Sequence, residues 1–376
     1  MKRNIYLMYA IAFLQGMVFY GPVATLYRQA QGVSVFQITV IESISLILCI
    51  LLEVVWGVVA DRIGYKKTMI FCCVLYFISK IIFWRASGFA GFLAERILLS
   101  IVAAGMSGVD ASILYLSCKK EDSQRAFGIY NSLGMAGLLA AAAVFSIFVR
   151  DDYRLSGLLT VISYGMAAVL SLALTDVSPE GSGRISKVGF RQVLSQTLSD
   201  RNLLLFLVGA AFLNETHQTV TVFLNQLQYE KCGLGNTAIG SIFIIATLLG
   251  TCGAASAWFT KRMGSRAAGA AFGGIAVVSC ITLAAARTAL PSVCGILALR
   301  ISNSLFQPFQ TEIQNRKVHT EYRATALSIH AMILDSIGAG TNLVFGALAE
   351  KNLAAAFLFG AGICAAGWAV TIHTHA

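Results

Sequence analysis

The chain has 376 residues, of which 57% are hydrophobic and only 12% are charged, and its formal net charge at pH 7 is +10. An ordinary soluble domain carries about a quarter charged residues, so this composition cannot cover the surfaces of two or three globular domains. The mean hydropathy of +0.74 indicates that most segments prefer lipid. The composition therefore excludes a cytosolic enzyme, a nucleic-acid-binding domain and a disordered protein.

Twelve segments are long and apolar enough to cross a membrane. A membrane helix needs about 20 mostly apolar residues, because each residue rises about 1.5 Å and the hydrocarbon core is about 30 Å thick. In chain order the predicted spans are 5–26, 36–60, 68–84, 88–116, 126–149, 154–176, 202–228, 236–260, 267–286, 290–314, 323–348 and 352–372. The loops leave no room for a soluble domain, so we predict an all-α membrane protein.

Lys and Arg are distributed unevenly between alternate loops. With the N-terminus in the cytoplasm, the inner side carries eighteen of the 28 basic residues and the outer side carries eight, while Arg96 and Arg300 lie inside spans. Cytoplasmic loops of membrane proteins are enriched in Lys and Arg. We therefore expect a multi-pass protein of the plasma (cell inner) membrane with both termini in the cytoplasm, and no nucleic acid is needed to explain the basic charge.

The longest inner connection, residues 177–201, divides the chain into two sets of six spans. It is rich in Gly and Ser at its start, and it then places four aliphatic residues between positions 188 and 198 near helical spacing. This pattern is typical of a linker followed by a short helix that lies on the membrane surface. We expect an N-terminal half of residues 1–176, this cytoplasmic linker and a C-terminal half of residues 202–376.

The two halves match each other at an offset of about 200 residues in the sequence. The matching pairs are Arg62 and Arg262, Gly64 and Gly264, Arg96 and Arg300, and Arg125 and Arg323. Because the pairs occur in the same order at equivalent positions, they indicate two parallel six-span repeats, which is a transporter architecture. The predicted fold is two six-helix bundles related by pseudo-two-fold symmetry.

The sharpest local signal lies between the second and third spans and reads Gly57-Val-Val-Ala-Asp61-Arg62-Ile-Gly64-Tyr65-Lys66-Lys67. It strongly resembles the loop motif of the major facilitator superfamily, Gly-x-x-x-Asp-Arg-x-Gly followed by basic residues. The resemblance extends to the layout of six plus six spans and implies a secondary transporter, without identifying a subfamily. The second copy has Lys261 where Asp is expected.

The resemblance also implies a conformational latch in this loop. Its residues are Gly57, Asp61, Arg62, Gly64, Lys66 and Lys67. In the family, Asp61 would stabilise one conformation by contacting the neighbouring half, and Gly64 would permit a tight turn. A helix end followed by a positive-inside anchor explains Lys66 and Lys67 equally well.

No enzymatic signature accompanies this resemblance. The five histidines form no HExxH motif, and the chain contains no GxxxxGK phosphate loop, GxSxG elbow or GxGxxG turn. The nine cysteines are scattered and show no zinc-binding spacing. We therefore expect no enzymatic activity, no cofactor and no metal, and a single chain of two halves is sufficient as a monomer.

Six carboxylates and two arginines stand out inside the predicted spans. They are Glu42, Glu53, Glu95, Arg96, Asp110, Glu215, Arg300 and Asp335. At about 3 kcal/mol each they would together cost roughly 24 kcal/mol if they faced lipid, which exceeds the net stability of a protein. Most must therefore face a cavity or one another, and the equal depth of Glu42 and Arg96 permits an ion pair with either a structural or a functional role.

Two spans of the second half carry polar stripes. The stripe of span seven is Asn214, His217, Gln218, Thr221 and Asn225, and that of span ten is Arg300, Asn303, Gln307, Thr311 and Gln314. Buried amides need hydrogen-bond partners, so these faces must meet water, a ligand or each other. Polar packing between the two helices is the alternative to a cavity lining.

Family resemblance places spans one, four, seven and ten around the central cavity, and span one offers an aromatic wall with Phe13, Phe19 and Tyr20. The residues expected to line the substrate cavity are Gln15, Phe19, Arg96, Asn214, His217, Gln218, Thr221, Arg300, Asn303 and Gln307. One polar wall and one aromatic wall suit an amphipathic small molecule.

Uphill transport without ATP requires an ion gradient, and a proton carrier needs a buried carboxyl group that can bind and release a proton. The candidates are Glu215, Asp335, Glu53 and Asp110. Glu215 and Asp335 are favoured equally because both lie near mid-membrane, and a structural ion pair with Arg300 is the competing explanation. Sodium in place of the proton stays open.

Small relatives with short loops favour proton-coupled efflux of an amphipathic compound as the function. Against export, span five reads Gly134-Met-Ala-Gly137 and lacks the Gly-Pro element typical of antiporters in this superfamily, and span one lacks an embedded acidic residue. The alternatives are proton-coupled uptake of a polar solute and a non-transporting membrane receptor.

Overall fold

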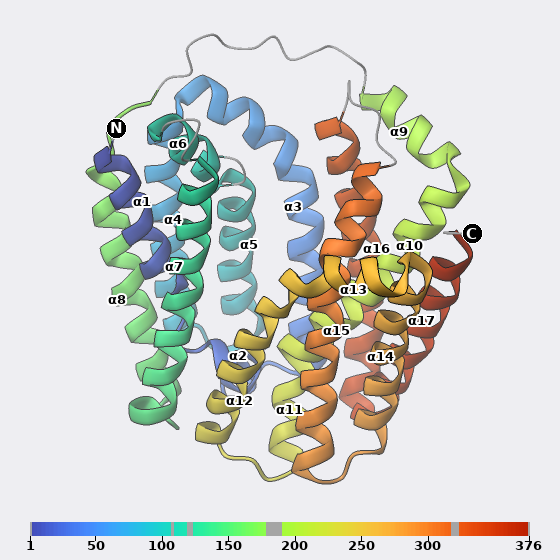
Figure 1. The fold of residues 1–376 in the computed structure, drawn as a ribbon. Helices are drawn as coiled ribbons and strands as arrows, with labels where there is room; N and C mark the ends of the chain where they lie inside the picture. The colour runs from blue at the N-terminus through green and yellow to red at the C-terminus, as the bar shows by residue number, and fades with distance from the viewer. Residues whose placement is uncertain (1, 107–108, 119–122, 178–189, 317–322, 375–376) are drawn as a thin grey trace. The chain divides into compact units, whose positions relative to one another are not determined.

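The computed structural model describes residues 2–106, 109–118, 123–177, 190–316 and 323–374. These residues form helices joined by short turns, and none of them lies in a β-strand. Figure 1 shows the helices in chain order. The predicted all-α class is therefore confirmed.

Every predicted span corresponds to one helix or to a set of consecutive helices. The single helices are α3 (Val35–Ile63), α4 (Tyr65–Arg85), α8 (Tyr153–Leu172), α14 (Ser265–Ala285), α15 (Ala289–Arg316), α16 (Arg323–Lys351) and α17 (Leu353–Thr374). The first span contains α1 (Lys2–Gly16), a 3₁₀ turn (Gly21–Val23) and α2 (Ala24–Ala30). The fourth contains α5 (Gly88–Met106) and α6 (Val109–Ser117).

The remaining spans also change their helical geometry along their length. Helix α7 (Ser123–Val144) ends in a π-helical turn (Phe145–Val149). The seventh span contains α10 (Arg201–Gln218), a π-helical segment (Thr219–Leu224) and α11 (Asn225–Lys231), and the eighth contains α12 (Asn236–Leu249), a 3₁₀ segment (Gly250–Ala255) and α13 (Ser256–Met263).

Among the described residues, eleven segments are long and apolar enough to cross a membrane by length and composition. The predicted seventh span, from α10 to α11, is not one of the eleven. It is the span that carries Asn214, Glu215, His217 and Gln218 close together. Its polar side chains therefore set it apart from the other spans.

The chain divides into two compact units. Unit 1 comprises Met1–Val33, Ile44–Arg184 and Asn236–Ile244, and unit 2 comprises Ser34–Ser43, Ile185–Gly235 and Ile245–Ala376. The main part of each unit follows one predicted half. The first turns of α3, however, belong to unit 2, and the first turns of α12 belong to unit 1. The boundary at residues 177–201 stays a prediction.

Hydrogen bonds explain why the first turns of α3 belong to unit 2. Ser43 Oγ donates to the carbonyl oxygen of Ala339 on α16 at 2.9 Å, and the Phe36 backbone N–H donates to Glu350 Oε2 at 3.0 Å. At the start of α12, Asn236 Nδ2 donates to Asp151 Oδ1 of unit 1 at 2.9 Å. These hydrogen bonds link each first turn to the unit to which it is assigned.

Equivalent helices of the two units have equivalent neighbours. In unit 1, α1 packs on α7 and α8, and α4 packs on α5 and α8. In unit 2, α10 packs on α16 and α17, and α14 packs on α15 and α17. Because the first and third spans of each unit contact the same partners in the same order, the packing confirms the repeat in the sequence.

The matched glycines Gly64 and Gly264 have the same backbone conformation. Gly64 has φ 93° and ψ 148° at the start of α4, and Gly264 has φ 84° and ψ 155° at the start of α14. Only glycine adopts this region without strain. The Arg-x-Gly pattern therefore produces the same turn in both units, and Gly64 does permit the tight turn expected in the latch motif.

The short helix predicted after the linker is present as α9 (Phe190–Ser199), which packs on α10 and α16. Leu194 of α9 packs against buried Ala326 and Ile329 of α16. Leu198, one turn further along α9, is exposed. Residues 178–189, which include Val188 of the predicted pattern, lie outside the described residues.

Candidate functional site

The two predicted polar stripes meet in unit 2, where α10 packs on α15. Asn214 Nδ2 donates to Gln310 Oε1 at 2.9 Å, and Gln307 Nε2 donates to Asn214 Oδ1 at 2.9 Å. Asn214 is therefore held by two amides of α15, so polar packing between the helices accounts for part of the pattern. Gln310 lies between the predicted stripe residues Gln307 and Thr311, and the assumed face did not include it.

Four polar side chains of α10 and α15 remain fully or partly exposed. Gln218, Gln307 and Thr311 are exposed, and Asn214 is partly exposed. We call these four residues the polar face. A membrane helix cannot turn amides to hydrocarbon without a large cost, so the polar face must border water or a ligand.

The stripe of span seven does not continue along one face beyond Gln218. The segment from Thr219 to Leu224 is π-helical, which changes the rotation per residue that the α-helical spacing assumed. Asn225 is buried, and its side chain accepts a hydrogen bond from the Gln226 backbone N–H at 2.8 Å. Thr221 remains close to the preceding stripe residue His217, with its hydroxyl 3.2 Å from His217 Nε2.

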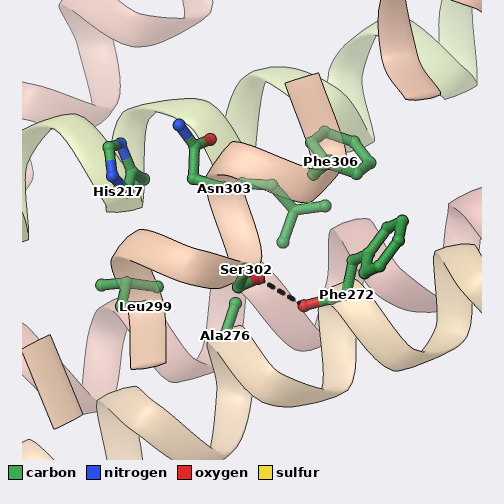
Figure 2. Close-up of a pocket in the computed structure, with 8 residues that line it drawn as sticks. His217, Phe272, Ala276, Leu299, Ser302, Asn303 and Phe306 are labelled. Carbon is green, nitrogen blue, oxygen red and sulfur yellow. Dashed lines mark hydrogen bonds between the residues drawn. The ribbon is translucent and has the colours of Figure 1, made fainter. Parts of the chain in front are cut away.

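A small pocket lies between α10, α14 and α15. Its lining residues are Leu213, His217, Phe272, Ala276, Leu299, Ser302, Asn303 and Phe306. Figure 2 shows His217 beside Asn303, and it shows the hydrogen bond of 2.6 Å from Ser302 Oγ to the Phe272 carbonyl oxygen. The pocket volume of about 10 Å³ fits a single water molecule.

Asn303 Oδ1 is buried at this pocket and has no hydrogen-bond partner among the described residues. A buried carbonyl oxygen of this kind normally has a partner, so a water between His217 and Asn303 would satisfy it. The pocket combines polar and apolar side chains, with the rings of Phe272 and Phe306 lining it together with His217 and Asn303.

Glu215 faces a different neighbour from His217. The Thr219 hydroxyl donates to Glu215 Oε1 at 2.7 Å and lies 3.3 Å from Asn342 Oδ1 on α16. Glu42 and Asp335 both act electrostatically on Glu215. Unit 2 thus gathers three carboxyl groups, from α3, α10 and α16, around one buried position.

Arg300 is held by α12 rather than by an acidic side chain. Its Nε donates to the Ala246 carbonyl oxygen at 3.3 Å, and a Cβ added at Gly250 would approach the guanidinium to 2.8 Å. Glu215 has Thr219 as its partner. The structure therefore does not form the competing ion pair between Arg300 and Glu215.

The predicted residues of span one lie at a break in the helix. The Phe19 N–H donates to Thr160 Oγ1 at 3.0 Å, and the Tyr164 hydroxyl donates to the Gln15 carbonyl oxygen at 2.5 Å. The Gln15 side chain, which is partly exposed, donates to Cys73 Sγ at 3.5 Å. Phe19 and Tyr20 are each only 6% exposed, so their rings are buried inside unit 1 in this structure.

The other predicted residues are spread over unit 1 and α16. Asp110 begins α6 and accepts a hydrogen bond from the Tyr130 hydroxyl at 3.3 Å, while Arg96 and Asp335 are partly buried. In the latch motif, Lys66 is partly buried and Lys67 is exposed. The side chains of Glu53, Gly57, Asp61 and Arg62 lie outside the described residues.

Sequence reasoning missed a buried ion pair in unit 1. Lys80 Nζ lies 3.3 Å from Glu95 Oε1 and donates to the Tyr20 hydroxyl at 3.0 Å, and the two charged side chains are 4% and 1% exposed. The ammonium group also lies over the rings of Tyr76 and Tyr164, 5.1 and 5.4 Å from their centroids. We call these residues the lysine cluster.

Lys80 was counted among the outer basic residues, and this assignment was wrong. Its side chain is buried in unit 1 and does not belong to a loop. A signal for the pair was available, because Lys80 precedes the end of α4 and Glu95 follows the start of α5 by similar distances along the chain. Residues placed in this way lie at similar depth in an antiparallel helix pair.

Removing the Asn214 amide gives a first test of this site. Asn214→Leu is expected to lower the free energy of unfolding by about 1 kcal/mol, because two hydrogen bonds between α10 and α15 are lost. The double variant with Gln310→Leu is expected to lose less than the sum of the single losses. Equilibrium unfolding in detergent measures both, and additive losses would show that the two amides are not coupled.

A family model described as Major Facilitator Superfamily matches residues 5–341. Two structures of the nucleoside transporter NupG have TM-scores of 0.84 and 0.83 at 15% identity; they cover 99% of this chain, and 100% and 99% of theirs. A bacterial homolog of the human lysosomal transporter Spinster has a TM-score of 0.72 at 15% identity, covering 99% of this chain and 93% of that one.

A mutant of the peptide transporter POT has a TM-score of 0.77 at 13% identity, with 98% of this chain and 93% of that chain covered. No curated protein sequence matches the chain. At these identities the structural likeness shows the fold alone, while the family model covers most of the chain. The chain therefore belongs to the major facilitator superfamily, and it is a membrane transporter rather than an enzyme.

Proposed function

We propose that the protein is a proton-coupled secondary transporter that exports a small amphipathic molecule by alternating access. The observation that carries the proposal is the polar face, where Gln218 and Gln307 are exposed on helices of a membrane transporter. Amides in this position recognise a solute through hydrogen bonds when water or the solute reaches them. We further propose a monomer in the plasma membrane with both termini in the cytoplasm.

The pocket beside the polar face supports the amphipathic character of the solute. His217 and Asn303 offer hydrogen-bonding groups, while Phe272 and Phe306 offer apolar rings. In this structure the pocket accepts only about one water molecule. A larger solute would therefore have to bind on the polar face or in a conformation in which α10 and α15 are further apart.

Glu215 is the proposed proton carrier. It is buried on α10, with its carboxyl group bonded to Thr219 and with Glu42 and Asp335 acting on it electrostatically. A buried negative charge is costly and neighbouring negative charges repel each other, so Glu215 is suited to bind and release a proton. The arrangement favours Glu215 over Asp110, whose partner is the Tyr130 hydroxyl.

Glu215→Gln is expected to abolish uphill transport while leaving exchange of solute across the membrane intact. A potential of about 150 mV is worth roughly 3.5 kcal/mol per charge, so the accumulation ratio should fall from up to several hundredfold to about one. Counterflow and gradient-driven transport in proteoliposomes measure the two activities separately. Replacing sodium with choline in the buffer distinguishes a proton from a sodium ion.

The matched control is Glu230→Gln, because Glu230 is exposed on α11 and the substitution is chemically the same. This variant should retain gradient-driven transport. If uphill transport survives in Glu215→Gln, Glu215 is not the proton carrier and this proposal is wrong. Survival in Asp335→Asn as well would show that neither carboxyl group couples transport to the proton.

Proton-coupled uptake of a polar solute is the second candidate. The burial of Phe19 and Tyr20 in unit 1 favours uptake of a polar solute. With these two rings buried, span one offers no aromatic wall to complement the exposed side chains of the polar face. A nucleoside transporter and a POT family transporter in complex with 5-aminolevulinic acid share the fold. Those solutes are polar, although the likeness itself concerns the fold.

Expression in a drug-sensitive host separates the candidates. Export should confer resistance to an amphipathic compound, and an uncoupler should remove that resistance. Uptake should instead raise the accumulation of a polar solute inside the cells. A non-transporting receptor should change neither quantity, and that result would contradict both transport candidates.

A further inference from the structure

A larger pocket lies on unit 1 between α3, α4 and α5. Its volume is about 670 Å³, which is within the range of pockets that bind drug-sized molecules. Its apolar lining residues are Trp56, Ile63, Phe71, Leu75, Leu98 and Ile101. We call it the α3–α4–α5 groove.

The shape of the groove is fixed by packing. The rings of Trp56 and Phe71 contact each other with centroids 5.9 Å apart. Gly105 on α5 leaves space for the Trp56 ring, because a Cβ there would lie only 3.1 Å from Trp56 Cδ2. Any larger residue at Gly105 would push the ring out of place.

The groove is open on the outside of these three helices. Ile63 and Phe71 are 52% and 51% exposed, respectively. An open apolar groove on a membrane protein is in contact with the hydrocarbon of the bilayer, and a groove of fixed shape holds a hydrocarbon chain better than a flat surface does. The lining therefore favours an extended apolar chain as the occupant.

One end of the groove is basic. Lys67, in the first turn of α4, lines the groove and is exposed. The neighbouring Thr68 hydroxyl donates to the Gly64 carbonyl oxygen at 3.0 Å, so it is not left for a ligand. No acidic residue is among those that line this groove in the described part of the chain. The Lys67 ammonium group would attract an anion placed beside it.

We propose that the α3–α4–α5 groove binds an anionic phospholipid, with an acyl chain against Trp56 and Phe71 and the phosphate group at Lys67. Basic pockets between membrane helices bind anionic headgroups in this way. Lys67 belongs to the latch motif, so the bound headgroup would act directly on the segment that joins α3 to α4. The proposal does not depend on the solute or on the coupling ion.

Trp56 provides a direct probe of the acyl chain. In a variant with Trp84, Trp258 and Trp368 replaced by Phe, Trp56 is the single tryptophan. This variant is placed in phosphatidylcholine vesicles that contain a small fraction of phosphatidylglycerol with brominated acyl chains, which quench tryptophan fluorescence on contact. The quenching should be several-fold greater than with the same fraction of brominated phosphatidylcholine.

Lys67→Gln should reduce the quenching by brominated phosphatidylglycerol to that of brominated phosphatidylcholine. Lys66→Gln is the matched control, because Lys66 is adjacent but does not line the groove. It should retain the preference for phosphatidylglycerol. Equal quenching by the two lipids in the parent protein, or equal effects of the two lysine variants, would overturn the proposal.

Native mass spectrometry tests the same site without tryptophan substitutions. The full chain purified in mild detergent should retain phosphatidylglycerol, and the retained amount should fall several-fold in Lys67→Gln but not in Lys66→Gln. Retention that does not depend on Lys67 would contradict a headgroup site at this residue. This measurement decides the question even if the single-tryptophan variant does not fold.

Discussion

Lys80→Met is expected to lower the free energy of unfolding by about 3–5 kcal/mol, because it leaves a buried carboxylate without its partner. Lys80 and Glu95 are almost fully buried, and the Lys80 ammonium group is 3.3 Å from Glu95 Oε1. Equilibrium unfolding in detergent, followed by circular dichroism, measures the loss. A change of this size is a large share of the roughly 5–15 kcal/mol that separates folded from unfolded proteins.

The double variant Lys80→Met with Glu95→Gln is expected to recover most of that stability, since it removes both charges from the lysine cluster. Lys261→Met is the matched control, because Lys261 is exposed on α13 and its loss should change stability by about 0.5 kcal/mol or less. Equal effects of Lys80→Met and Lys261→Met would show that the buried pair does not stabilise unit 1.

Gly137→Val is expected to separate α1 from α7 and to cost about 3 kcal/mol or more. A Cβ at Gly137 would collide with the carbonyl oxygen of Phe13, and it would lie 3.3 Å from the carbonyl carbon of Gly16. Both contacts are with backbone atoms, which cannot move aside as a flexible side chain can. Small residues at such crossings allow membrane helices to pack closely.

Gly128→Val is the control for this substitution, because Gly128 lies on the same helix and nothing is within 4 Å of a Cβ added there. It should change the free energy of unfolding by about 1 kcal/mol or less. Thermal unfolding of both variants in detergent gives the comparison. Similar melting temperatures for the two variants would exclude close packing as the role of Gly137.

The helices could be predicted from the sequence because length and hydropathy determine them almost alone. Span ten was predicted at 290–314, and α15 runs from Ala289 to Arg316. The interruptions could not be predicted in this way. The break between α1 and α2 lies where Thr160 of α8 bonds to the Phe19 backbone N–H, and hydropathy reports neither such contacts nor the π-helical segment that begins at Thr219.

Part of the candidate site could also be predicted from the sequence, in this case from helical spacing. Helical spacing identified α10 and α15 as the polar helices, and Asn214 and Gln307 do meet there. Spacing places Lys80 and Glu95 at similar depth, but it could not show that their side chains meet, since that depends on how α4 and α5 turn against each other. It also could not show which amides bond to each other and which remain exposed.

The burial of basic residues bears on the predicted orientation. Arg28 and Lys80 were counted on the outer side, but both are buried in unit 1, and the Arg28 guanidinium lies 5.5 Å from the centroid of the Phe83 ring. Leaving these two out reduces the outer loops from eight basic residues to six. The asymmetry between the two sides is therefore larger than the sequence count indicated, and the orientation itself stays a prediction.

The interruption of the first span has a consequence for how the molecule responds to a solute. Two side chains of α8 already bond the backbone groups that the missing helical turn releases, through Thr160 and Tyr164. An unwound stretch in the bilayer is stable only when such groups have partners. The protein's own side chains therefore satisfy the interrupted backbone, and the kink needs no hydrogen bond from a solute to persist.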